Sequence, residues 1–292
     1  MDLGRLGCWT FLDTLPIGEA VELVRKIEAW GYGALWVPEA VGRDPFALLA
    51  FLSARTERLI FATGIANIFA RDPMSLRALQ QTMAELSGGR FVLGLGVSHK
   101  PMVAGLRGHE YAQPLGTMRR VLESMKQAIY LGPAPAEEAP ILIGALRPRM
   151  LALSAELAQG AHPYNVPPEH TGRAREILGE GPLLCPDQKA ILEKDPSVAR
   201  GLGRKHLGTY LGLPNYRNNW RTLGFSDEDF ENGGSDRLID AVFVWGDETQ
   251  IAARLQAHHD AGADHVALQP LRSDGEMGPD LRLLEAFAPA RN

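Results

Sequence analysis

The chain has 292 residues, of which 45% are hydrophobic, and a formal net charge of −5. This length and apolar content suit one large α/β barrel or two ordinary domains. The near balance of charges excludes the basic footprint of a protein that binds nucleic acid or an anionic membrane. The sequence has no signal peptide and no apolar run of the roughly 18 residues that a membrane span needs, so we expect a cytoplasmic protein.

Cysteines and histidines give no sign of a metal site. Cys8 and Cys185 lie in apolar, strand-like segments without ligand spacing, and we expect two reduced, buried thiols. His258 and His259 are neighbours on a predicted helix, where their side chains diverge by about 100°, and we expect both at the surface. The remaining histidines lack carboxylate partners at ligand spacing, so we predict no metal.

The first third of the chain alternates apolar strands with amphipathic helices, which is typical of a parallel sheet with crossover helices. Gly31 marks the end of the first helix, and Asp44 followed by Pro45 marks the start of the second. The predicted elements are a strand at 5–10, a helix at 17–30, a strand at 34–38, a helix at 45–55 and a strand–helix–strand unit over 59–95.

The same alternation continues to the end of the chain, with one interruption at residues 196–237. That stretch is helical and aromatic and contains no clear strand. The other predicted elements are a helix at 117–131, a strand at 141–144, a helix at 149–158, a strand around 161–164, a helix from about 167, a strand within 182–192, a helix at 247–261, a strand at 265–269 and a helix near 281–287.

About eight strands, each near a helix, favour a (β/α)8 TIM barrel. No linker rich in proline or serine divides the chain, so we expect one domain over residues 1–292. We expect residues 196–237 to form a helical insertion before the last strand, which either covers the substrate as a lid or simply packs on the barrel. A doubly wound protein with two domains is the alternative fold.

Barrel enzymes bind their ligands at the carboxyl ends of the strands. In the unit at 59–99, Gly64, Gly94 and Gly96 come at such ends, where the missing Cβ lets a ligand approach the backbone closely. The strand ends contain no paired carboxylates and no nucleophile elbow. A site with so few acids and bases suits a reaction whose chemistry is supplied by a bound organic cofactor.

Three positions at the strand ends are candidates for a role in the site. His99 is a candidate acid or base over the barrel mouth, or else a loop histidine without a task. Glu39 is a general base, a carboxylate that caps the backbone, or, as we favour, a cofactor contact. The junction at 144–149 offers a helix N-terminus and the guanidinium of Arg147 or Arg149 to a phosphate.

Several motifs follow one another in a fixed order: Trp36-Val37-Pro38-Glu39, Ala62-Thr63-Gly64-Ile65, Ala70-Arg71-Asp72-Pro73, and Ser87-Gly88-Gly89-Arg90-Phe91 leading to Gly94-Leu95-Gly96. Together they resemble the bacterial luciferase-like superfamily. Later runs are similar to its deazaflavin branch, the coenzyme F420-dependent oxidoreductases: Ile143-Gly144-Ala145, Tyr210-Leu211-Gly212-Leu213-Pro214-Asn215-Tyr216, Leu223-Gly224-Phe225 and Ala261-Gly262-Ala263-Asp264-His265-Val266. The resemblance extends over residues 3–271.

The resemblance implies a TIM barrel, usually a homodimer, that transfers a hydride between coenzyme F420 and a small organic substrate. It also implies a non-proline cis peptide bond between Gly64 and Ile65, in a bulge against the coenzyme ring. By matching position to position, the residues that would line the ring are Glu39, Gly64, Ile65, Val97 and Ser98. Those that would approach the ribityl and phosphate end are Gly144, Ala145, Leu146 and Arg147.

The chain departs from the superfamily's sugar-phosphate dehydrogenases at two positions. Ala40 stands in place of their catalytic histidine and His99 in place of their catalytic glutamate, so glucose-6-phosphate oxidation by that mechanism is not expected. Arg147 also stands where a small residue is common. His99 becomes the best available proton partner for a hydride transfer. The alternatives are an FMN-dependent luciferase-like monooxygenase and a barrel that binds a flavin without catalysis.

Overall fold

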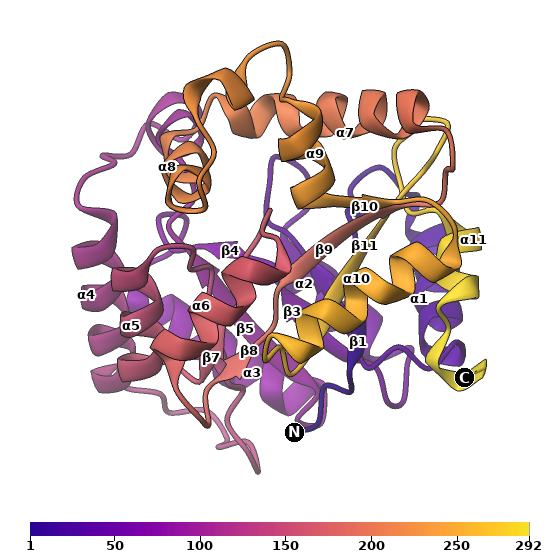
Figure 1. Cartoon of the computed structure of the whole chain (residues 1–292). Coiled ribbons are helices and arrows are strands. Elements are labelled where there is room, and N and C mark those ends of the chain that lie inside the picture. The colour runs from indigo at the N-terminus through magenta and orange to yellow at the C-terminus, as the bar shows by residue number, and fades with distance from the viewer. Residues whose placement is uncertain (292) are drawn as a thin grey trace.

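A curled sheet of parallel strands surrounds the core in the computed structural model, which describes residues 1–291 (Figure 1). Neighbouring strands follow the order β11, β1, β2, β3, β5, β6, β7, β8, and a short β4 pairs with β5. Their bounds are β1 Leu6–Trp9, β2 Ala34–Val37, β3 Ile60–Thr63, β4 Ala66–Asn67, β5 Phe91–Gly96, β6 Ile141–Ile143, β7 Gly160–Ala161, β8 Leu183–Leu184 and β11 Val266–Leu271.

The sheet closes into a barrel because β8 continues almost directly into β9 (Asp187–Ile191). In register, Leu183 of β8 lies beside Gly160 of β7, whereas Asp187 of β9 lies beside Ala267 of β11. A backbone hydrogen bond of 2.9 Å from Asp187 N to Pro163 O continues the pairing across the junction. The predicted TIM barrel is therefore confirmed.

Helices surround the barrel and connect successive strands (Figure 1). The predicted start of α2 is confirmed, since Pro45 occupies the first turn and the Asp44 carboxylate accepts a 2.9 Å hydrogen bond from Ala47 N. The helices that surround the barrel are α1 Ile17–Ala29, α2 Pro45–Ser53, α3 Pro73–Leu86, α4 Pro114–Gln127, α5 Pro148–Leu157, α6 Pro168–Leu178, α10 Glu248–Asp260 and α11 Leu281–Ala286. None of the helices within residues 1–291 is long and apolar enough to cross a membrane.

One predicted helix is displaced along the sequence. We expected a helix at 117–131, but α4 begins at Pro114 and ends at Gln127. Proline favours the first helical turn because its φ angle is already helical and its missing N–H has no partner to lose there. At the other end, Ala128 has an extended backbone with ψ of 133°, which ends the helix.

The segment between β9 and β10 (Phe243–Trp245) is helical and covers the carboxyl ends of the strands, at the top of Figure 1. Tyr216, Trp220 and Phe230 of this segment belong to a buried apolar cluster that also includes Ile191 and Leu271 of the barrel. β10 adds a short parallel pairing to β9 that we did not predict. The elements of the segment are α7 Pro196–Leu211, α8 Pro214–Thr222, the 3-10 turn η2 Asp227–Phe230 and α9 Asp236–Val242.

Apolar side chains from alternate strand positions fill the lower part of the barrel interior. Trp9, Trp36 and Ala62 belong to this interior cluster, and the Trp36 ring stacks on the His162 ring at 4.4 Å between centroids. A second, larger cluster lies between the strands and the outer helices. This packed interior closes the lower part of the barrel, so a ligand can bind only near the carboxyl ends of the strands.

Candidate functional site

A cavity of about 230 Å³ lies at the carboxyl ends of the strands, beneath α7 and α8. Its walls come from the ends of β1, β2, β3, β5, β6 and β7, from the π-helical turn η1 (Pro101–Leu106) and from the insertion. The sequence-predicted residues that line it are Glu39, Gly64, Ile65, Val97, Ser98, His99, Gly144, Ala145 and Leu146. Arg147 does not; it is exposed at the N-cap of α5.

One wall of the cavity is built around Ile65 and glycines that allow close packing. The peptide bond between Gly64 and Ile65 is cis, as the resemblance implied. A Cβ on Gly96 would lie 2.4 Å from Ile65 Cδ1, and a Cβ on Gly64 would lie 2.8 Å from Trp9 Nε1. The Trp9 indole donates a 3.0 Å hydrogen bond to Gly64 O. Glycine at both positions therefore leaves a wall with few side chains, against which a planar ring fits.

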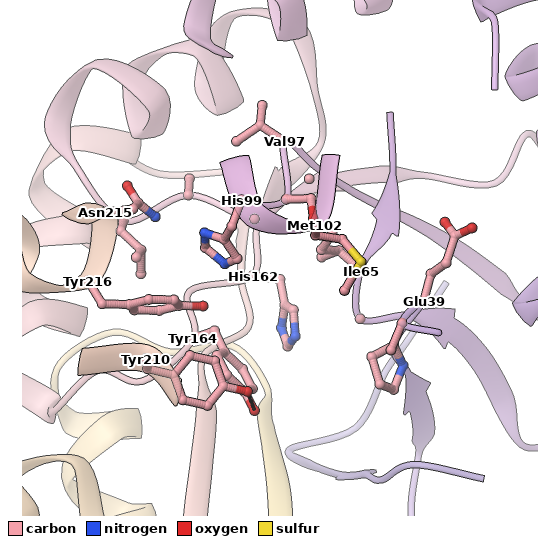
Figure 2. A pocket seen from close by; sticks show the side chains of 18 of the residues that line it. Glu39, Ile65, Val97, His99, Met102, His162, Tyr164, Tyr210, Asn215 and Tyr216 are labelled. Atoms are coloured by element: carbon pink, nitrogen blue, oxygen red, sulfur yellow. Dashed lines mark hydrogen bonds between the residues drawn. The ribbon is translucent and has the colours of Figure 1, made fainter. Parts of the chain in front are cut away.

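Glu39 holds the bulge in place from behind. Its backbone N–H donates to Ile65 O at 3.1 Å, and its carboxylate accepts from Asn67 N at 2.8 Å and from Arg71 at 2.9 Å. Figure 2 shows the carboxylate directed away from the cavity. Of the roles left open by the sequence, the structure shows backbone capping, and this ion-paired carboxylate is not free to act as a base.

His99 follows β5 and lines the cavity between Tyr216 and Met102 (Figure 2). Its ring centroid lies 5.3 Å from that of Tyr216, and no described residue hydrogen-bonds to its ring nitrogens. Burial lowers the pKa of His99, because the apolar surroundings disfavour the charged form. The imidazole is therefore neutral near pH 7, with both nitrogens available to a ligand.

The opposite wall is aromatic and polar, and sequence reasoning found only part of it. Tyr210 and Tyr216 come from the insertion that we expected to cover a substrate. Tyr164 follows β7, and its hydroxyl lies 3.1 Å from that of Tyr210 and 3.2 Å from Gln269 Oε1. Figure 2 shows the three tyrosines on one side and Ile65 on the other.

Sequence reasoning did not identify His162, which lines the cavity, or a buried ion pair below the cavity as parts of the site. His162 Nδ1 lies 2.6 Å from Cys185 O, and its Nε2 is buried without a partner. Burial lowers the pKa of His162 to about 4. Lys189 and Asp187 form a 2.7 Å ion pair inside the barrel. The usable signal was the position of these residues directly after or within predicted strands.

The prediction that His258 lies at the surface is wrong. His258 is fully buried, and its ring nitrogens lie 2.8 Å from Thr171 Oγ1 and 2.9 Å from Gln188 Oε1. The reason is that this face of α10 packs against α6 and the barrel. His259 is partly buried, 3.0 Å from Ala263 O.

Both cysteines, Cys8 and Cys185, are buried free thiols, as predicted. Burial raises the pKa of each thiol well above its ordinary value, which keeps both protonated. Within residues 1–291, no three side chains of the metal-binding kinds gather at one place.

The N-terminus of α5 lies beside the wall formed by Gly64, Ile65 and Gly96, which we call the glycine wall. Gly144 N donates to Leu95 O at 2.8 Å, while Ala145 and Leu146 line the cavity before the helix begins at Pro148. Free N–H groups at such a junction attract a phosphate. The flat wall, the unpartnered Nε2 of His162 and this helix start together fit a planar coenzyme with a phosphate tail.

A TIM barrel with a cavity at the carboxyl ends of its strands defines the class of protein. The sequence profile of the luciferase-like monooxygenases matches residues 1–265, and the chain belongs to this family.

Curated relatives include a protein named for coenzyme F420 and a reductase named for its pterin substrate. A Mycobacterium tuberculosis protein provisionally named a coenzyme F420-dependent oxidoreductase is 29% identical, with 73% of each chain covered. A 5,10-methylenetetrahydromethanopterin reductase of Archaeoglobus fulgidus is 28% identical over 51% of this chain and 50% of its own.

Solved structures share the fold. The coenzyme F420-dependent tetrahydromethanopterin reductase of Methanopyrus kandleri has a TM-score of 0.72 at 17% identity, covering 99% of this chain and 98% of its own. An F420-dependent secondary alcohol dehydrogenase has a TM-score of 0.77 at 13% identity, with 98% and 97% covered. The oxygenating constituent of a Pseudomonas putida 3,6-diketocamphane monooxygenase, in complex with FMN, has a TM-score of 0.68 at 14% identity, with 98% and 96% covered. The chain is therefore similar in fold to both deazaflavin and flavin enzymes.

Proposed function

We propose that this protein is an oxidoreductase that transfers a hydride between coenzyme F420 and a small organic substrate. The observation that carries the proposal is the cavity wall at Gly64 and Ile65, which offers a flat face at the barrel mouth. The 29% identity to the mycobacterial F420-dependent oxidoreductase supports the deazaflavin over a flavin.

Each side chain has a role in this proposal. Gly64, Ile65, Val97 and Ser98 contact the coenzyme ring, and Glu39 holds the bulge through its ion pair with Arg71. The ribityl and phosphate end lies along Gly144, Ala145 and Leu146, while Arg147 lies outside the cavity at the N-cap of α5. When bound, the coenzyme supplies or accepts the hydride, and the neutral imidazole of His99 exchanges a proton with the substrate.

An FMN-dependent monooxygenase is the second candidate. It is favoured by the family's description and by the FMN-bound neighbour of the same fold. Both candidates use the same wall, because the two coenzymes share a planar tricyclic ring.

A titration of the purified protein with each coenzyme separates the candidates. We expect quenching of F420 fluorescence with a micromolar Kd and weaker binding of FMN. Protein that is isolated yellow and releases FMN would favour the second candidate. If neither coenzyme binds at micromolar concentration, both proposals are wrong, and only a barrel without this cofactor chemistry remains.

The proposal retains two expectations from the sequence, a homodimer and a cytoplasmic location. Light scattering coupled to size-exclusion chromatography tests the first, and fractionation of cells tests the second.

A further inference from the structure

The aromatic wall of the cavity has a polar centre that the proposed function does not yet use. We infer that the hydroxyl group of Tyr210, which is paired with that of Tyr164, binds the oxygen atom of the substrate, and that this substrate is uncharged. The inference rests on the proposed function, because it assigns the glycine wall to the coenzyme and the opposite wall to the substrate.

The hydrogen-bond geometry leaves Tyr210 free to contact a ligand. Tyr164 donates to Gln269 Oε1 at 3.2 Å, so its oxygen accepts from Tyr210, 3.1 Å away. A hydroxyl has one donor and two acceptor positions, so Tyr210 keeps a lone pair for a ligand O–H. Rotation of its own O–H toward the cavity lets it donate instead. The same oxygen can therefore bind either a carbonyl or an alcohol, the two states that a hydride transfer interconverts.

Charge on the walls argues against an anionic substrate. Among residues 1–291, no lysine or arginine lines the cavity. Lys189, a buried cation, lies against the Tyr164 ring at 3.5 Å from its centroid and is paired with Asp187. Arg71 and Arg107 are likewise paired with Glu39. A phosphate or carboxylate would lose its water here without gaining a free positive partner, which is costly.

The surrounding surface suits an apolar body attached to that oxygen. The Trp9 ring lies 5.3 Å from the Tyr164 ring and packs edge to face with Phe11 at 5.1 Å, and the Tyr216 ring lies 5.1 Å from that of Tyr210. These faces line the cavity together with Met102. A compact, neutral alcohol or ketone buries its carbon skeleton against them and places its oxygen on Tyr210.

The test measures binding of matched probes to the protein loaded with its coenzyme. Cyclohexanol, cyclohexanone and benzyl alcohol are the neutral probes, and cyclohexanecarboxylate and benzoate are anions of similar skeleton. Binding is read from the change in coenzyme absorbance, so turnover is not required. We expect neutral probes to bind at least about tenfold more tightly than the anions, given the cost of burying an unpaired charge.

Variants of the two tyrosines test where the substrate oxygen binds. Tyr210→Phe should weaken the neutral probes by about fivefold, the effect of one neutral hydrogen bond, and leave the coenzyme Kd unchanged. Tyr164→Phe removes only the partner that orients the Tyr210 hydroxyl, so it should weaken the neutral probes by a smaller factor. Tyr130→Phe, outside the cavity, is the control and should change neither Kd. Equal or tighter binding of the anions, wild-type affinity in Tyr210→Phe, or no binding of any neutral probe would overturn the inference. A failed coenzyme titration would instead overturn the proposed function.

Discussion

His99 combines three properties of a proton carrier in one residue. It follows a barrel strand, it lines the cavity, and burial lowers its pKa so that the neutral ring is present at pH 7. The adjacent aromatic ring of Tyr216 limits its movement without occupying its nitrogens. This arrangement makes the proton-transfer role testable by a single substitution.

We predict that His99→Ala slows turnover by about 10²-fold while the coenzyme Kd stays within about twofold of wild type. In the wild type, kcat/KM should fall as the pH drops through the lowered pKa of His99, because the protonated ring cannot accept a proton. His109→Ala, at an exposed histidine, is the control. An unchanged rate in His99→Ala would remove the residue from the mechanism.

A substitution at Gly96 tests directly whether the coenzyme binds against the glycine wall. A Cβ there would lie 2.4 Å from Ile65 Cδ1 and 2.6 Å from Ile65 Cγ1, so the Ile65 side chain has to move. We predict that Gly96→Ala weakens coenzyme binding by about tenfold, a cost of roughly 1.4 kcal/mol that is ordinary for overpacking. Gly105→Ala is the matched control, since nothing lies within 4 Å of its Cβ position. Wild-type affinity in Gly96→Ala would show that the coenzyme does not use this wall.

At the scale of elements, the bulge after β3 depends on the ion pairs of Glu39, one with Arg71 at 2.9 Å and a longer one with Arg107 at 3.5 Å. The Glu39 side chain is only 6% exposed, and Arg71 binds it and also Asp44, the N-cap of α2. Arg71 therefore links the bulge, the end of β2 and the start of α2. Removing Arg71 leaves a buried carboxylate without its main counter-charge.

We predict that Arg71→Met lowers the free energy of unfolding by about 2 kcal/mol in urea titrations. Adding Glu39→Gln to this variant should recover part of the loss, because it removes a buried charge that then keeps only the longer ion pair with Arg107. The control is Arg77→Met, whose partner Glu138 is 57% exposed, and it should cost less than about 1 kcal/mol. Equal losses in the two single variants would contradict a special role for the buried pair.

The sequence predicted elements best where local chemistry alone decides their ends. Asp44 and Pro45 start α2, and Gly31, with φ of +84°, follows the end of α1. The prediction from the sequence failed where tertiary packing decides the structure. β10 is a three-residue strand stabilised by its pairing with β9, and the burial of His258 follows from how α10 lies on the barrel.

The residues of the site also fall into two groups, those that the sequence predicts and those whose position depends on tertiary packing. Barrel topology alone brought the strand-end residues Gly64, His99 and Gly144 to one cavity. The hydroxyl pair of Tyr164 and Tyr210 joins residues 46 positions apart, and its geometry depends on how the insertion folds over the barrel. No periodicity in the sequence encodes that contact.

At the scale of the whole molecule, buried neutral histidines connect the packing of the barrel to pH. Burial lowers the pKa of His162 and His265 to about 4 and that of His258 to about 3, from 6.5 when exposed. Each is held by hydrogen bonds in the folded core. Between pH 6.5 and about 4, the unfolded chain therefore binds protons at these positions that the folded chain does not.

We predict that the free energy of unfolding is nearly constant from pH 8 to 7 and falls steeply from pH 6.5 to 4.5. Each buried histidine contributes up to about 1.4 kcal/mol per pH unit in that window, because protons bind more strongly to the unfolded state. Urea titrations at half-unit intervals measure the slope. His258→Asn should reduce the slope by about one proton whatever it does to stability at pH 7, whereas His109→Asn should leave it unchanged. Equal stability at pH 7 and pH 5 would show that these histidines bind protons without unfolding, and that the barrel interior is open to water.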